Sequence, residues 1–217
     1  MKIELRFAVI GRARFLSHLE CVDLLLAAFR RADLRVALSN GMRPKPVISL
    51  AVARAVGVAS EDEVATVELI DEAPPEVVME RLARTLPRGF ELRSAQESPG
   101  RPRPVAARYR VMLAGGLDEI ERAAAGYLAA TEALVERRSP KGTKTVDAKR
   151  FADAVSVVEG GFEVEIAISQ EGSARPEEVA RAMQAHAVSP LLVTGVTRIE
   201  LRVERSVTVV GAPGESE

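Results

Sequence analysis

The sequence predicts an α+β fold made of tandem duplicated ferredoxin-like (βαββαβ) units with antiparallel sheets. Strand-like and helix-like apolar periodicities alternate along the chain as strand, helix, strand, strand, helix, strand. The same order then returns, which is typical of an internal duplication. A segment rich in proline and arginine separates the two runs. The predicted organisation is a first unit over residues 1–96, a linker over 97–105, a second unit over 106–205 and a flexible acidic tail over 206–217.

The first unit is predicted to open with a strand over residues 2–10 and a helix over residues 17–32. Ser17 and Glu20 form a capping-box pattern, so the helix is expected to begin there. The strand alternates, and its apolar face consists of Ile3, Leu5, Phe7 and Val9. The helix is predicted from apolar residues at helical spacing, which are Leu19, Val22, Leu25, Leu26 and Phe29.

The other elements of this unit follow from the same patterns. Pro74-Pro75 suits the start of a second helix, and Gly89 suits its end. The segment Ser39–Pro46 is predicted to be a loop, because two prolines and a glycine exclude a helix or a central strand. Strands are predicted over residues 34–38, 47–52, 64–70 and 90–95.

The second unit repeats this order less regularly. One helix is predicted over residues 117–131, and another opens at Pro176. The basic loop Arg138–Lys144 corresponds to Ser39–Pro46, because each follows the first helix of its unit and each contains proline and glycine. Strands or extended segments are predicted over residues 107–113, 133–137, 146–158, 162–168 and 193–203.

The composition is that of an ordinary globular protein. The chain has 217 residues, of which 47% are hydrophobic and 28% charged, and its net charge is -1. No apolar run approaches the roughly 20 residues of a membrane-spanning helix, so no membrane association and a cytoplasmic location are expected. Cys21 is the only cysteine, which excludes an internal disulfide and a cysteine-based cluster. We expect neither a metal nor a cofactor.

The charged residues are sorted into blocks. Basic residues dominate from Arg30 to Arg54, from Arg101 to Arg110 and from Arg137 to Arg150, whereas the run from Glu61 to Glu80 has acids and no base. A single block of this kind is usually solvated surface. Three basic blocks in loop-like places favour a face that binds a polyanion.

Among the candidate residues, His18 has the widest range of possible chemical roles. It lies in the first turn of the predicted helix, where free backbone N–H groups and the helix dipole favour an anion. Histidine exchanges protons near neutral pH, so His18 is a weak candidate for general acid/base catalysis. It can equally donate a hydrogen bond to a phosphate, or be a packed histidine with neither role.

Basic and polar residues beside this helix complete the candidate binding set. Arginine holds a phosphate with two hydrogen bonds and lysine with a point charge. The candidate residues for binding RNA or another substrate are Arg12, Arg14, Ser17, His18, Ser39, Arg43, Lys45, Lys141 and Lys144. Asp147 is a weaker candidate acid, and a surface ion pair is its simpler interpretation. No P-loop, dinucleotide fingerprint, zinc motif or nucleophile elbow occurs, and aromatic residues at 4% are too few for base stacking as the main mode of recognition.

Several segments resemble the family of radical-SAM-linked proteins. The segments are Arg14–Glu20, Phe29–Leu34, Ser39–Pro46, Gly57–Ser60 and Glu63–Leu69, and the resemblance is much looser in the second half, at Lys144–Asp147. That family occurs alone or as a C-terminal extension of cobalamin-binding radical SAM proteins. The resemblance implies an accessory role in RNA modification or processing, with a radical SAM enzyme and a ribonuclease of the E/G type as partners. The chain has no Cys-x-x-x-Cys-x-x-Cys motif, so it would be the linked partner and not the radical enzyme.

Three functions therefore stay open. The first is a non-catalytic accessory protein that binds RNA (tRNA or rRNA) through basic loops. The second is a metal-independent endoribonuclease that uses His18, and the predicted architecture resembles that of CRISPR repeat-processing endoribonucleases at the level of fold. The third is a protein–protein adaptor that presents the acidic run from Glu61 to Glu80 to a basic partner.

Overall fold

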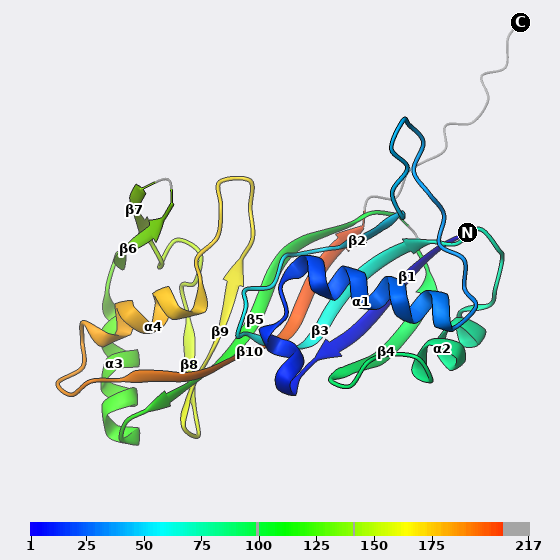
Figure 1. Cartoon of the computed structure of the whole chain (residues 1–217). Helices are drawn as coiled ribbons and strands as arrows, with labels where there is room; N and C mark the ends of the chain where they lie inside the picture. Colours follow the sequence, from blue (N-terminus) through cyan, green and yellow to red (C-terminus); the bar gives the residue numbers. More distant parts are fainter. Residues whose placement is uncertain (99, 141, 206–217) are drawn as a thin grey trace, which may run out of the picture.

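The computed structural model describes residues 1–98, 100–140 and 142–205 and has a mixed α/β architecture (Figure 1). These residues form four α-helices, one short 3-10 helix and a mostly antiparallel sheet. The predicted tail over 206–217 and the candidate Lys141 lie outside the described residues. None of the four helices is long and apolar enough to cross a membrane.

In the first half of the chain, two helices cover one face of the strands. The elements are β1 (Lys2–Val9), η1 (Gly11–Phe15), α1 (His18–Arg31), β2 (Ile48–Leu50), β3 (Ala59–Glu68), α2 (Pro75–Ala83) and β4 (Phe90–Glu97). The strands lie in the order β4-β1-β3, with β2 also on β3, and all of these pairs are antiparallel. The apolar face predicted for the first strand is confirmed, because Ile3, Leu5, Phe7 and Val9 are all buried in one cluster with residues of α1 and α2.

Helix α1 begins where the capping box predicts. The Ser17 side chain accepts a hydrogen bond from the Glu20 backbone, and the Glu20 carboxylate accepts one from the Ser17 backbone. The predicted core stripe is only partly right, because Leu19 is 73% exposed. A narrower stripe faces the sheet, consisting of Cys21, Leu25, Ala28 and Phe29. Both sets follow one helical face, but the buried face is rotated away from Leu19 toward Cys21 and Ala28.

The second half has the same order of strand pairing with a hairpin added. Its elements are β5 (Pro102–Ala114), α3 (Leu117–Ala129), β6 (Leu134–Ser139), β7 (Gly142–Asp147), β8 (Val155–Val158), β9 (Gly161–Ala167), α4 (Pro176–Gln184) and β10 (Leu192–Arg205). The strands lie in the order β10-β5-β9-β8, again all antiparallel. Strands β6 and β7 form a separate two-stranded sheet.

Strand β10 joins the two halves. Its residues Thr197 and Arg198 pair in parallel with Ala59 and Ser60 of β3, which makes one continuous sheet. Further along, β10 contacts acidic side chains of the first half. The Leu201 backbone N–H donates to Asp62 at 2.8 Å, and the Arg205 side chain contacts Glu4 at 2.6 Å. A small apolar cluster of Val64, Ala107 and Leu201 lies between the halves.

Several local expectations are corrected by the structure. Residues 34–38 make only isolated bridges and no strand, and η1 was not predicted. Strand β3 begins at Ala59, five residues before the predicted start at Val64, because pairing with β10 extends it. The basic segment Arg138–Lys144 was predicted as a loop, but most of it forms the ends and tip of the β6–β7 hairpin.

Candidate functional site

The first group of candidate residues surrounds the start of α1. Ser17 is the N-cap, and His18 is half-buried in the first turn. The His18 Nδ1 atom is buried and makes no hydrogen bond to the described residues. The capping hydrogen bonds with Ser17 lower the pKa of Glu20. This part of the structure therefore explains Ser17 as a helix cap, and His18 has no carboxylate partner among the residues that the structure describes.

Arg12 and Arg14 lie on η1, directly before this helix. The Arg14 guanidinium lies 4.8 Å from the centre of the Phe15 ring, and both arginines are exposed. Arg12 lines a cavity of about 790 Å³ together with Arg88 and Glu91. Neither Arg12 nor Arg14 forms an ion pair with a described acidic residue. They remain available to an external anion.

The loop Ser39–Pro46 is closed by its own hydrogen bonds. The Lys45 N–H donates to the Ser39 hydroxyl at 3.1 Å, and the Ser39 N–H donates to the Lys45 carbonyl at 2.8 Å. Arg43 and Lys45 are exposed. Ser39 and Lys45 line a cavity of about 360 Å³, to which Lys2 and Arg101 also contribute.

The candidates of the second half lie on the β6–β7 hairpin. Lys144 is exposed on β7, opposite Arg137 of β6. Arg137 reaches back to α4, where its guanidinium binds the Glu178 carboxylate at 2.6 and 2.7 Å. Asp147 accepts hydrogen bonds from the backbone N–H groups of Ala133 and Lys149 at 2.8 and 3.0 Å, which is a local structural role.

The structure places these candidates in three separate regions. Helix α1 has 14 residues, so about 21 Å separates the η1 end from the end that leads to Ser39–Pro46. Figure 1 shows the β6–β7 hairpin beside α4, in the second half of the molecule and away from α1. The two loops that flank α1 line different cavities.

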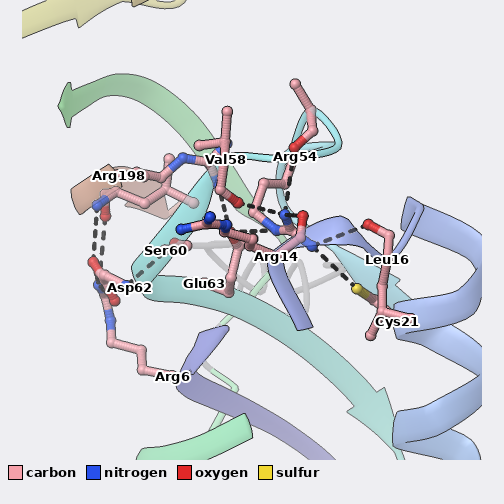
Figure 2. Close-up of polar contacts among 12 residues, drawn as sticks. Arg6, Arg14, Leu16, Cys21, Arg54, Val58, Ser60, Asp62, Glu63 and Arg198 are labelled. Carbon is pink, nitrogen blue, oxygen red and sulfur yellow. Dashed lines mark hydrogen bonds and ion pairs between the residues drawn. The ribbon is translucent and has the colours of Figure 1, made fainter. Parts of the chain in front are cut away.

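A buried polar network that the sequence-based predictions did not include connects the start of α1 to the second half (Figure 2). The Arg54 guanidinium, 7% exposed, donates to the carbonyl of Arg14 at 2.7 Å, to that of Leu16 at 3.2 Å, and to the carbonyl of Val58. It also lies 3.5 Å from the Cys21 sulfur. Arg54 thereby holds the segment that carries Arg14 and precedes the capping box.

The network continues through Glu63 to β10. The Glu63 carboxylate accepts a hydrogen bond from Arg198 at 3.0 Å and lies 3.9 Å from the Arg54 Nε. Glu63 and Arg198 are each 2% exposed. Burial raises the pKa of Glu63, and the charges of Arg198 and Arg54 act in the opposite direction. Removing one member of such a set leaves an uncompensated buried charge, at a cost of about 3–5 kcal/mol.

Not all hydrogen-bond donors of the Arg198 guanidinium have an acceptor among the described residues. Its Nε is buried and finds no acceptor among the described residues. A buried donor without a partner costs about 1–3 kcal/mol. The Tyr109 ring lies 5.8 Å from the Arg198 guanidinium carbon, so one side of this group faces an aromatic surface. Cys21 is no nucleophile candidate, because burial raises the pKa of its thiol.

A cavity of about 680 Å³ opens beside this network, between the two halves. The first half contributes the segment around Arg54, and the second half contributes β5, β9 and the start of α4. Its lining includes the arginines Arg54, Arg175, Arg181 and Arg198, the glutamates Glu177 and Glu178, and the apolar residues Val52, Val58, Ile166 and Ile168. The volume lies within the range of small-molecule sites, about 300–1,000 Å³.

A sequence signal for this network did exist. Arg198 follows Val196 by two residues in an alternating strand, so both lie on the same, buried face. A charged side chain at an inward position of a strand is uncommon unless it is paired. The sequence around Arg54 shows no comparable pattern. Arg54 lies at the end of the basic block that begins at Arg30, which is typical of surface charge.

Fold and site together define an α+β protein of two similarly connected halves, with a buried arginine–glutamate network and a cavity at their junction. The chain belongs to the family described as "Uncharacterized protein conserved in bacteria (DUF2344)", whose model matches residues 2–190. The matched segment includes both halves up to the residues before β10. No curated protein matches the chain.

Proposed function

We propose that this protein is a non-catalytic accessory protein that binds RNA through exposed basic loops and works with a radical SAM enzyme. The RNA part rests on one observation, the distribution of unpaired cations. The partnership, and the further link to a ribonuclease of the E/G type, rest on the resemblance to radical-SAM-linked proteins.

The arginines of the sheet are paired with acidic residues, whereas many basic residues of the loops are not. The loop residues Arg35 and Arg150 are exceptions, because they pair with Asp71 and Glu171. Arg103, Arg108 and Arg110 of β5 each contact a glutamate on a neighbouring strand at 2.6–3.8 Å, although the sequence grouped them as a basic block. The cations without an acidic partner among the described residues lie in or beside loops and at the hairpin, and include Arg12, Arg14, Arg43, Lys45, Arg88, Arg101 and Lys144. Such a distribution favours contact with phosphates, which releases counterions and makes affinity depend on salt.

The acidic run offers less support for the adaptor alternative. Its residues are spread over β3, the following loop and α2. Asp62 pairs with Arg6, Asp71 with Arg35, and Glu63 is buried. Few of these charges therefore remain for a basic partner.

We further propose that the two halves are tandem ferredoxin-like units that arose by duplication. The shared strand orders, β4-β1-β3-β2 and β10-β5-β9-β8, support this proposal, as does the position of two helices in each half. The β6–β7 hairpin would then be an insertion at the place that Ser39–Pro46 occupies in the first unit.

RNA binding is tested by fluorescence anisotropy with bulk tRNA and with a single-stranded RNA as probes. The expected result is binding at low salt that weakens steeply as salt rises. Replacing both Arg43 and Lys45 with alanine should reduce the salt slope by roughly 1–2, the loss of one or two phosphate contacts. A matched control is the pair Arg84→Ala and Arg150→Ala, which removes the same charge from residues that already pair with Glu80 and Glu171.

The outcome that contradicts the proposal is the absence of RNA binding at low salt, or equal effects of the two double variants. The partnership has a separate test, affinity purification of the tagged chain from its own cells followed by mass spectrometry. Recovery of neither a radical SAM enzyme nor a ribonuclease would refute that part alone.

A further inference from the structure

The cavity at the junction of the two halves has features of a ligand site that the RNA proposal does not use. Arg12, Arg43, Lys45 and Lys144 are absent from its lining. Its walls come from segments far apart in the sequence, including Val52–Ala55, Ile166–Ile168 and Ala174–Glu178. A volume of about 680 Å³ accommodates an organic molecule much larger than an inorganic ion.

The charged side chains that line the cavity include more arginines than glutamates. Four arginines line it against two glutamates. Arg54 and Arg198 share the buried Glu63, which is not part of the lining. Glu178 is bound by Arg137, also outside the lining, and lies 3.9 Å from Arg181, so Arg175 is the lining arginine that forms no ion pair with a described residue. Arg175 and Arg181 are exposed at the edge, whereas Arg54 and Arg198 are buried. An anionic group would therefore meet guanidinium groups both at the entrance and at the inner wall.

The inner wall contains a donor that lacks an acceptor. Arg198 is 2% exposed, lines the cavity, and uses its Nη1 for Glu63, while its buried Nε has no partner among the described residues. The Nε itself is closed to solvent, so the other parts of the Arg198 guanidinium are what this wall offers to an anionic ligand. The apolar side chains of Val52, Ile166 and Ile168 offer contacts for the uncharged part of the same ligand.

We propose that this cavity binds an organic phosphate of nucleotide size, with the phosphate held by Arg198 and Arg175 and the organic body against the apolar wall. A phosphate monoester carries close to two negative charges at neutral pH, which matches the excess of arginine better than a single carboxylate does. The ligand is either a free mononucleotide-like molecule or the phosphorylated end of a nucleic acid strand, which share this chemistry.

The test uses isothermal titration calorimetry with adenosine and uridine 5′-monophosphates, the corresponding nucleosides, and inorganic phosphate as probes. The expected result is binding of at least one monophosphate about tenfold or more tighter than its nucleoside and than inorganic phosphate. Absence of binding by both monophosphates at millimolar concentration would overturn the proposal. Equal affinity for nucleoside and monophosphate would overturn it as well.

Two variants in one loop locate the site without disturbing the buried network. Ala53 is exposed and lines the cavity, so Ala53→Trp should fill it and weaken the monophosphate about tenfold or more. Val56, 61% exposed and outside the lining, provides the matched control Val56→Trp, which should leave the affinity unchanged. Equal affinities for the two variants would contradict this location. Arg175→Ala should weaken the monophosphate and leave the nucleoside unaffected.

A competition experiment distinguishes the two sources of phosphate. Displacement of the bound monophosphate by a 5′-phosphorylated oligonucleotide, and not by its unphosphorylated form, would assign the site to a strand end. Failure of both to displace it would assign the site to a free molecule. The alanine replacements at Arg43 and Lys45 should not change monophosphate binding, so this proposal and the RNA proposal can fail independently.

Discussion

The loop Ser39–Pro46 and the β6–β7 hairpin occupy corresponding places in the two halves, yet they are held very differently. Each follows the first helix of its half and precedes the next strand of the main sheet. The loop is closed by hydrogen bonds between Ser39 and Lys45, and the Met42 side chain at its tip is fully exposed. The hairpin pairs over six positions of each strand.

The difference lies in what each segment packs against. Val135 and Val146 of the hairpin are buried in the core of the second half, and Arg137 binds Glu178 on α4. Similar composition, basic with proline and glycine, thus gives an anchored hairpin in one half and an exposed loop in the other. The apolar residues that flank the basic ones decide how firmly each segment is held, whereas Lys144 on the hairpin is as exposed as Arg43 and Lys45 in the loop.

The largest expected effect tests the anchor of the hairpin. Arg137→Ala should lower the free energy of unfolding by about 3–5 kcal/mol, because it leaves the 1% exposed Glu178 carboxylate without its main partner. Urea denaturation followed by circular dichroism measures the change. A double variant, Arg137→Ala with Glu178→Ala, should be more stable than Arg137→Ala alone. A loss below about 1 kcal/mol would show that the hairpin is no better anchored than the loop.

The Arg137–Glu178 ion pair should also make the free energy of unfolding depend on pH, whereas the loop Ser39–Pro46 contains no carboxylate that could do so. Burial alone would raise the pKa of Glu178, but the hydrogen bonds from Arg137 and the Arg175 backbone outweigh it, so the pKa is lowered. The stabilisation is therefore complete above the unfolded pKa, about 4.3, and is lost as pH falls through the lower folded value. The stability difference between the wild type and Glu178→Gln should be largest near neutral pH and shrink below about pH 4. A difference that grows in acid would reverse the assigned direction.

The local elements were largely predictable from the sequence, because their causes are local. The capping box at Ser17, the prolines before α2 and α4, and the alternation of β1 all act within a few residues. The early start of β3 depends instead on β10, and the burial of Arg198 on β10 depends on Glu63 of β3. The two strands are more than a hundred residues apart in the sequence. The periodicity of a strand shows which residues face inward, as for Arg198, but it does not show which distant strand is the partner.

The candidate site was predictable only in part, for the same reason. The segment with Arg43 and Lys45 was correctly predicted to lie outside helices and central strands, because of its prolines, and both side chains are exposed. Their separation from Arg12 follows from the predicted helix over residues 17–32, which lies between the two segments, but the candidate set was nevertheless treated as one binding face. Arg54 and Glu63 were counted among surface charges, although their partners bury them.

A substitution at Tyr127 measures how strongly the segment after the hairpin, which includes Ala152, is held to α3. Its hydroxyl donates to the Ala152 carbonyl, and burial raises the pKa of Tyr127 to about 12. Tyr127→Phe should cost about 0.5–1.5 kcal/mol, the net worth of one hydrogen bond. The hydroxyl stabilises the fold below the unfolded pKa of about 10, and this contribution is lost as pH rises through the folded value. Spectrophotometric titration should show one phenol ionising near 12 in the wild type and none there in Tyr127→Phe.

The smallest expected effect belongs to the exposed loop. Replacing Arg43 and Lys45 with alanine should change the free energy of unfolding by less than about 0.5 kcal/mol, because both side chains are exposed and neither has an acidic partner among the described residues. Urea denaturation under the conditions used for Arg137→Ala makes the two segments directly comparable. A loss above about 1 kcal/mol would mean that these cations stabilise the fold, and a loss of RNA binding in the variant would then have a structural cause. An unchanged stability leaves contact with an external polyanion as the reason for any loss of binding.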